Sequence, residues 1–390
     1  MTDGELILVA GALLAGALAA SRLAEAIRVP GLVLFLGLGM AIGSDGTGWI
    51  DFSDYRLART IGTIALALIL FEGGLAADQD EVRTLLPTSI RLATLGTVLT
   101  AVVAGLAAAL LFDFSALEGL LLGAILASTD GAAIFAVLRG SALRRRLAGA
   151  LEGEAGLNDP VAVLLVLGFI DWIDKPGYGL GNMVLLFLRQ LGVGLVVGLV
   201  IGRIAAWTLG RVRLGSLGLN PVASLAVAGL AYGAADALTG SGFLAVYLAG
   251  LVLGGARAPG GRTISSFHVG LAWIAQVAMF LTLGLLVFPS QLGDVAVEGA
   301  VLAVVVAVLA RPLGVAASTV PGRFSWRERA VLGWAGLRGA VPVVLATFPV
   351  LHHVPHSLQF FNIVFFAVLL STLVQGATFE PLARRLGATQ

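Results

Sequence analysis

Long apolar runs, separated by short polar segments, dominate the hydropathy pattern of this chain. A helix that crosses the hydrocarbon core of a membrane needs about 20 mostly apolar residues, and thirteen segments are close to this length. They cover roughly residues 5–27, 30–44, 60–77, 87–112, 116–138, 149–172, 181–207, 218–238, 241–256, 267–288, 294–319, 327–350 and 358–382. A membrane β-barrel would instead show alternating segments of about ten residues. The pattern therefore predicts an all-α membrane protein with 13 transmembrane helices.

Composition supports lipid as the main solvent of the chain. Hydrophobic residues make up 58% of the sequence and charged residues only 12%, whereas soluble domains carry about 25% charged residues. The 52 glycines fit close helix packing and interrupted helices in a membrane. The absence of cysteine excludes disulfides, thiolate catalysis and zinc–thiolate sites. The net charge of +1 does not indicate nucleic acid as a partner.

The distribution of basic residues predicts the orientation. With the N-terminus outside, the expected cytoplasmic loops and tail hold 18 arginines, and the outer loops hold only Arg56, Arg59 and Lys175. Cytoplasmic loops of membrane proteins carry this excess. The acidic N-terminus lacks the basic region of a signal peptide, so we expect the first apolar segment to remain as a span. We therefore expect a bacterial-type inner-membrane protein with an outer N-terminus and a cytoplasmic C-terminus.

No polar linker divides the chain, so we expect one transmembrane domain over residues 1–390 without a soluble regulatory domain. Spans one to six and eight to thirteen are equal in number, and an offset of seven spans turns the second half upside down. The chain then consists of a first repeat at about 5–173, a linker helix at about 181–207 and an inverted second repeat at about 218–385.

Two spans contain polar interruptions at corresponding places, fifth in each half. In the fifth span the apolar residues 123–127 meet Ser128-Thr129-Asp130-Gly131, and apolar residues resume from Ala132. In the twelfth span Leu337-Arg338-Gly339-Ala340-Val341-Pro342 interrupts the run. Gly and Pro weaken helices, and lipid cannot satisfy the freed backbone groups. Paired interruptions in inverted halves indicate the binding site of a transporter; two ordinary kinked helices are the alternative.

Four carboxylates and two arginines lie inside predicted spans, where each charge costs about 2.5–3.5 kcal/mol or more. They are Glu72, Asp130, Glu154, Asp159, Arg311 and Arg338. The densest polar cluster opens the sixth span, where Glu154, Asn158 and Asp159 share roughly one helix side. Pro160 follows directly and is expected to bend the helix beside Asp159.

Asp130 and Asp159 stand on adjacent predicted spans and, with the carbonyl groups of an unwound segment, form an oxygen-rich site suited to Na⁺ or K⁺. Burial raises the pKa of carboxyl groups in general, so such a group binds either a proton or a metal ion. Competition for one carboxylate produces exchange without another coupling device. We expect Asp159 to be this residue.

The other buried charges are expected to support the site. Arg338 needs an anionic partner, and Glu154 is the expected one, in a fixed ion pair. Arg311 is expected to tie spans together. Glu72 either tunes the site or caps its span near water.

The four histidines lie at predicted span ends or in loops, and we expect them to be solvated; a pH sensor or metal trap is the alternative. They are His268, His352, His353 and His356.

Four motifs in register resemble the NhaP/NHE class of cation–proton antiporters. They are Ser128-Thr129-Asp130, Glu154 through Asn158-Asp159-Pro160, Phe71-Glu72-Gly73-Gly74-Leu75 and Gly336-Leu337-Arg338-Gly339-Ala340-Val341. The similarity covers nearly the whole chain. It implies the NhaA/NhaP-like antiporter fold, with crossed broken helices at the fifth and twelfth spans. It also implies a homodimer in which a core subdomain moves against an interleaved dimerisation subdomain.

The resemblance also implies roles for single residues. Asp159 is similar to the shared proton and cation carboxylate, assisted by Asp130 and the Thr129 backbone, with Ser128 as a supporting residue. Asn158 replaces the first Asp of electrogenic relatives, which implies electroneutral exchange of one cation for one proton. Glu154 and Arg338 match the structural ion pair of the family.

One departure bears on the cation. Ala155 stands where relatives commonly have Ser, so a hydroxyl ligand is missing, and a looser site favours K⁺ over Na⁺. The wording of residues 152–160 also resembles the potassium/proton branch. We expect K⁺ with Na⁺ as second candidate, and no cofactor.

Three other functions are weighed against exchange. A cation channel needs a repeated filter motif, which the sequence lacks. An intramembrane enzyme needs a nucleophile–base or paired-Asp constellation at depth, and the buried Arg338 argues against one. A proton- or sodium-coupled symporter of a small organic solute is the nearest rival. We therefore expect a secondary transporter and not an enzyme.

Overall fold

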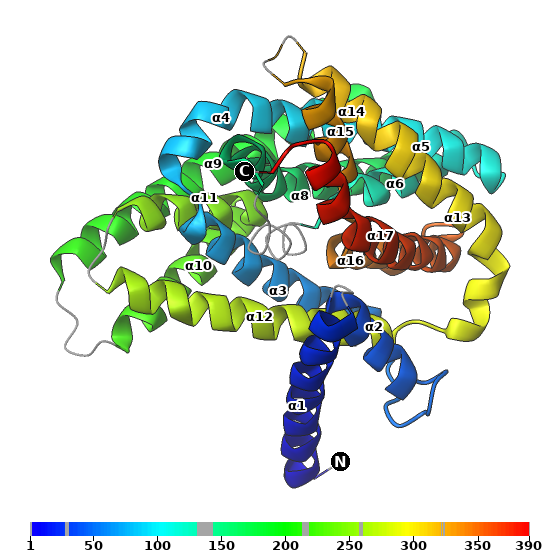
Figure 1. The fold of residues 1–390 in the computed structure, drawn as a ribbon, viewed down its shortest axis with the longest axis horizontal. Helices are drawn as coiled ribbons and strands as arrows, with labels where there is room; N and C mark the ends of the chain where they lie inside the picture. Colours follow the sequence, from blue (N-terminus) through cyan, green and yellow to red (C-terminus); the bar gives the residue numbers. More distant parts are fainter. Residues whose placement is uncertain are drawn as a thin grey trace.

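The computed structural model describes residues 2–27, 31–130, 143–212, 218–256, 260–320, 322 and 324–389 (Figure 1). In these ranges the fold is helical, and the one β-type pairing is an isolated bridge between Leu143 and Thr389. The chain is therefore all-α, as predicted from the apolar runs.

The helices of the first half follow the predicted spans closely. They are α1 (Asp3–Ile27), α2 (Gly31–Ile42), α3 (Tyr55–Ala76), α4 (Gln79–Arg91), the π-helix η1 (Leu92–Gly96), α5 (Thr97–Leu111), α6 (Ala116–Ala127) and α8 (Arg145–Asp174). The long helix α9 (Leu180–Arg211) comes next. The predicted continuation of the fifth span beyond Asp130 lies outside the described residues.

The second half of the chain also contains long, short and irregular helices. It contains α10 (Leu219–Ala237), α11 (Gly242–Gly255), α12 (Gly261–Leu285), the 3₁₀ helix η2 (Pro289–Val295), α13 (Ala296–Val305), the π-helix η3 (Val306–Ala310), α14 (Arg311–Ser318), α15 (Trp326–Trp334), α16 (Ala340–Leu351) and α17 (Ser357–Arg385).

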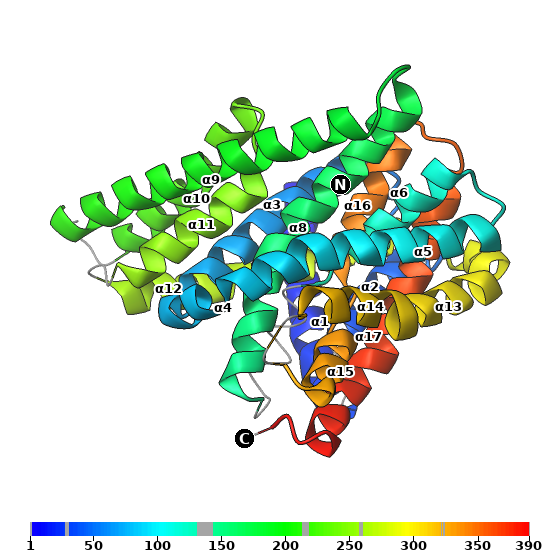
Figure 2. The same cartoon turned by 90° about the horizontal axis from the view of Figure 1, so that it is seen from above.

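Among the described residues, eight helical segments are long and apolar enough to cross a membrane, and four shorter apolar helices accompany them. The chain is a multi-pass membrane protein. Helices α9 to α12 gather on one side, whereas α5, α6 and α13 to α17 gather on the other (Figures 1 and 2). Helices α3 and α8 lie between these two groups, and α1 projects away from the body (Figure 1).

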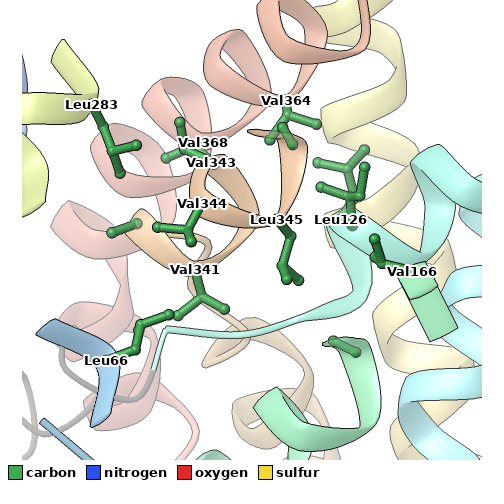
Figure 3. Close-up of a cluster of buried hydrophobic side chains, with 14 of the residues drawn as sticks. Leu66, Leu126, Val166, Leu283, Val341, Val343, Val344, Leu345, Val364 and Val368 are labelled. Carbon is green, nitrogen blue, oxygen red and sulfur yellow. The ribbon is translucent and has the colours of Figure 1, made fainter. Parts of the chain in front are cut away.

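An apolar cluster surrounds α16 and joins it to its neighbours (Figure 3). Helix α16 contributes Val341, Val343, Val344 and Leu345. The other labelled members come from five helices and are Leu66, Leu126, Val166, Leu283, Val364 and Val368. Apolar packing therefore fills the space on one side of the helix interruptions.

Glycines let helix backbones touch where two helices cross tightly. A Cβ atom on Gly123 of α6 would lie 2.2 Å from the Ala101 carbonyl oxygen of α5. On the facing helix, a Cβ on Gly105 would lie 2.7 Å from the Leu120 Cα. Both positions meet backbone atoms that no side-chain rotation can move away. In membranes, small residues allow this close approach of helices.

We expect Gly123→Ala to lower the free energy of unfolding by about 1–3 kcal/mol, the usual cost of overpacking. The measurement is denaturant unfolding in detergent micelles. Gly192→Ala on α9 is the matched control, because a Cβ there has nothing within 4 Å. An equal loss in both variants would mean that helix contact does not explain Gly123.

Candidate functional site

The first interruption begins where α6 ends in the middle of the protein. A capping box of Ser115 and Glu118 starts α6 at its other end. After Ala127 the chain becomes extended at Ser128, with φ −64° and ψ 145°, and the Ser128 hydroxyl donates to the Ile125 carbonyl at 3.2 Å. The helix therefore stops where the polar motif was predicted to interrupt it.

The second interruption separates α15 from α16. Helix α15 ends at Trp334 and α16 begins at Ala340, so residues 335–339 are unwound. A Cβ atom on Gly339 would lie 1.7 Å from Oδ2 of Asp130. Any side chain at this position would therefore displace the carboxylate of the other interruption.

The two interruptions contact each other, and each places a charged side chain at the end of the other's helix. The Asp130 backbone N–H donates to the Leu337 carbonyl at 2.8 Å, and the Asp130 carboxylate accepts from the Ala340 N–H at 2.9 Å. In the opposite direction, Nε of Arg338 donates to the Leu126 carbonyl in the last turn of α6 at 3.2 Å. A negative charge thus lies at a helix N-terminus and a positive charge at a helix C-terminus, the favourable arrangement for both helix dipoles.

Helix α8 brings an amide and a carboxylate to this crossing. The Asn158 side-chain Nδ2 donates to the Thr129 hydroxyl, which ties α8 to the first interruption. Asp159 is 3% exposed, and it interacts electrostatically with Asp130. In the described part of the chain, neither Oδ1 of Asp159 nor Oδ1 of Asn158 has a hydrogen-bond partner. Buried acceptors without donors are rare and costly, so a proton or cation is the natural complement of this site.

The donor set suits a weakly held monovalent ion. The described residues contain no group of three or more His, Cys, Asp or Glu side chains placed to hold a metal. Two carboxylates, with hydroxyl, amide and backbone oxygens beside them, are the hard oxygen ligands that alkali cations choose.

The predicted ion pair between Glu154 and Arg338 is wrong. Both carboxylate oxygens of Glu154 accept from Arg311, with Nη2 to Oε2 at 2.7 Å. Arg311 follows the π-helix η3 directly, and the wider turn changes the direction in which the next side chains point. Its side chain passes over Gly336, where a Cβ would lie 2.7 Å from Nε. Arg338 instead donates to the Leu126 and Gly336 carbonyls.

The structure also corrects the expectations for Glu72 and for one histidine, His268. Glu72 lies inside α3 with 8% exposure, so it is not a cap in water. His268 is 1% exposed on α12, and its Nε2 lies 2.8 Å from the Ser224 hydroxyl. The expectation of a solvated His268 is therefore wrong. His352, His353 and His356 are exposed, as expected.

Three polar residues of α17 that contact the second interruption escaped the sequence prediction. They are Ser371, Thr372 and Gln375, whose hydrogen bonds reach the backbone of Trp334 and Arg338. Their signal in the sequence is a short polar group inside the apolar segment 358–382.

The family of the chain follows from its comparison with known proteins. The family model described as sodium/hydrogen exchanger, transmembrane, matches residues 9–385. The chain belongs to the sodium/hydrogen exchanger family. The resemblance of the four motifs to this class is thereby confirmed.

Individual relatives of this family resemble the chain over nearly its whole length. It is 41% identical over 382 residues to the K(+)/H(+) antiporter NhaP of Alkalimonas amylolytica, an alignment that covers 97% of this chain and 66% of the relative. It is 40% identical over 378 residues to the K(+)/H(+) antiporter NhaP2 of Shewanella sp. (strain MR-4), covering 96% and 66%. The chain therefore spans just under two thirds of the length of these two relatives.

The fold is also similar to a solved exchanger structure. The sodium proton antiporter MjNhaP1 from Methanocaldococcus jannaschii, at pH 8, superposes with a TM-score of 0.83 and 25% sequence identity. The match covers 98% of this chain and 99% of MjNhaP1.

We expect Glu154→Gln to lower the free energy of unfolding by about 3–5 kcal/mol, because it leaves the Arg311 charge buried without its partner. Double-mutant cycles with Arg311→Gln and Arg338→Gln, measured by denaturant unfolding in detergent, identify the partner. The coupling energy of Glu154 with Arg311 should exceed that with Arg338 by at least about 1 kcal/mol. Stronger coupling with Arg338 would contradict the observed pairing.

Proposed function

We propose that the chain exchanges K⁺ or Na⁺ for protons across a bacterial plasma membrane by alternating access. The observation that carries this proposal is Asp159, a buried carboxylate beside the two helix interruptions, whose Oδ1 has no hydrogen-bond donor among the described residues. Membership of the exchanger family and the similarity to K(+)/H(+) antiporters support the same reaction.

Asp159 is the group that binds the proton and the cation in turn. Asp130 accepts a hydrogen bond from the Ala340 N–H at the start of α16, so its carboxylate is already engaged. Glu154 is neutralised by Arg311. Asp159 therefore remains as the carboxylate that gains or loses a proton during exchange. With the neutral Asn158 beside it, one proton replaces one monovalent cation, and exchange is electroneutral.

The remaining groups of the site orient the ligand atoms and select between K⁺ and Na⁺. Asn158 holds the Thr129 side chain, and the backbone oxygens of the first interruption complete the ligand set with support from Ser128. Ala155 is fully buried and adds no hydroxyl. A site with one fewer protein oxygen favours K⁺, which gains less from tight coordination, with Na⁺ as second substrate. Glu72, buried in α3, tunes the field of the site.

The architecture proposed for this activity has 13 spans in two inverted repeats, at about 5–173 and 218–385, joined by a linker helix at about 181–207. Support comes from corresponding irregularities. The fourth and eleventh spans each contain a π-helix, η1 and η3. The fifth and twelfth are the spans with interruptions. We also propose a homodimer with an outer N-terminus, a cytoplasmic C-terminus, and interleaved core and dimerisation subdomains.

A strip of contacts between α3 and the helices α16 and α17 closes the outer approach to Asp159 in this orientation. The pairs are Tyr55 with Phe361 at 5.5 Å between ring centroids, Arg59 with Phe348 at 5.4 Å, and Gly62 with Val344, whose Cγ2 would lie 2.6 Å from a Cβ on the glycine. Alternating access requires this strip to part when the site opens outward.

We expect Asp159→Asn to reduce cation-driven proton flux to the background of protein-free vesicles, because the amide cannot take up the proton. The measurement uses proteoliposomes with an internal pH dye and pulses of K⁺, Na⁺ or Li⁺. For the wild type, the apparent KM for the cation should rise about tenfold for each unit of falling pH on the acid side, since one proton competes for the site.

Asp171→Asn is the matched control for this experiment. Asp171 lies on the same helix, bonded to Lys175 at 2.8 Å, with 32% of its side chain exposed. This variant should exchange at the wild-type rate. Flux that survives Asp159→Asn would overturn the assignment of Asp159, and a wild type without flux for any cation would overturn the proposed function.

We expect a disulfide between Gly62→Cys and Val344→Cys to stop exchange until a reductant is added. A Cβ on Gly62 would lie 3.4 Å from the Val344 Cβ, close to the usual range of about 3.5–4.5 Å, and the chain has no other cysteine. Gly299→Cys with Phe366→Cys is the control pair, at 3.9 Å between α13 and α17, which pack within one helix group. Full exchange with a complete Gly62–Val344 cross-link would contradict the outer closure.

A further inference from the structure

Helix α17 grips the unwound segment of the twelfth span at both of its ends. Nε2 of Gln375 donates to the Trp334 carbonyl at 3.2 Å, where α15 ends. The Ser371 hydroxyl accepts from the Arg338 N–H at 3.1 Å. The Thr372 hydroxyl donates to the Arg338 carbonyl at 2.8 Å and shares its proton with the Val368 carbonyl of its own helix, also at 2.8 Å. We call Ser371, Thr372 and Gln375 the α17 clamp.

The clamp is internally connected, and two of its three residues are buried while Ser371 is half-buried. The Ser371 hydroxyl donates to Oε1 of Gln375, so each of these two side chains fixes the other. Thr372 is 4% exposed and Gln375 is 2% exposed. Buried polar networks whose members are satisfied hold one geometry, because any alternative leaves donors or acceptors unpaired.

Hydrogen bonds and a short stretch of backbone connect the clamp to Asp130. The clamp holds the backbone of Arg338, and the carbonyl of the preceding Leu337 accepts from the Asp130 N–H. Two residues further on, the Ala340 N–H donates to the Asp130 carboxylate. The Arg338 side chain reaches the end of α6 at Leu126. The clamp therefore holds the backbone segment to which Asp130 is bonded.

We propose that Ser371, Thr372 and Gln375 are positioning residues for cation exchange, which set the affinity of the site by holding the second interruption in register with Asp130. The proposal rests on the exchange function proposed above. The clamp does not touch the transported ion. It acts through the backbone of residues 334–338, and its loss lets Asp130 move away from the geometry that the cation requires.

Thr372→Val removes one clamp hydroxyl while keeping the size and branching of the side chain. We expect the apparent KM for K⁺ to rise about three- to tenfold, the order by which one hydrogen bond biases an equilibrium, while the maximal rate per folded molecule is kept. Thr372→Ser restores the hydroxyl and should restore the KM. Gln375→Met, which frees the other end of the segment, should raise the KM in the same way.

Thr100→Val is the matched control. Thr100 is fully buried on α5, and its hydroxyl donates only to the Gly96 carbonyl of its own helix segment, at 2.7 Å. The variant therefore loses a buried hydroxyl that does not reach the interruptions, and its KM should equal that of the wild type.

The measurement is K⁺-driven proton flux in proteoliposomes over a range of K⁺ concentrations, with the folded fraction determined by size-exclusion chromatography. A raised KM in Thr372→Val and Gln375→Met, rescued by Thr372→Ser, supports the clamp. An unchanged KM with a lower maximal rate would show that these residues only stabilise the fold, and overturns the proposal. A wild type that exchanges no cation is a different result, because it overturns the proposed function first and the clamp with it.

Discussion

Two interrupted helices that satisfy each other's ends are the constraint on which the rest of this structure depends. Lipid offers no hydrogen bonds, so backbone groups freed by an interruption must find partners inside the protein. Here Asp130 serves the N-terminus of α16, and Arg338 serves the C-terminus of α6. The backbone bond from Asp130 to Leu337 joins the two segments directly. Removing either interruption would leave the other with unpaired groups and an uncompensated charge.

The chemistry of the site depends on which carboxylates already have a partner in this arrangement. Asp130 accepts from the N-terminus of α16, and Glu154 accepts from both Nη1 and Nη2 of Arg311. Asp159 interacts electrostatically with Asp130 and has an oxygen that lacks a donor in the described residues. A buried carboxylate in this situation is stabilised by a proton or by a small cation. The fold thus separates carboxylates that hold the structure from the one that we propose to bind the transported ion.

Much of the fold and part of the site could be predicted from local patterns. Each predicted apolar run contains at least one helix in the described residues, and the Gly- and Asp-containing motifs predicted where α6 ends and where α15 and α16 separate. The partner of Glu154 could not be predicted in this way. Arg311 and Arg338 are both buried cations of the second half. Arg311, which binds Glu154, directly follows a π-helix, so a regular helical period does not predict where its side chain points. A hydropathy pattern is interpreted with a regular helix in mind and does not reveal a π-helix.

The surroundings of His268 and of the α17 clamp could not be predicted from the local sequence either. His268 lies near the start of its helix, which suggested solvent, yet α3 and α10 cover it, with Phe71 4.9 Å from its ring and Ser224 bonded to it. Ser371, Thr372 and Gln375 are ordinary polar residues in an apolar run until the unwound backbone of residues 334–338 is placed against them.

The sequence by itself determined the membrane class, the helical segments, the two interruptions and the set of buried charges, because each depends on the solubility of a short stretch of chain. Only the tertiary structure decided which buried charges neutralise each other, because pairing depends on distances and directions between residues far apart in the chain.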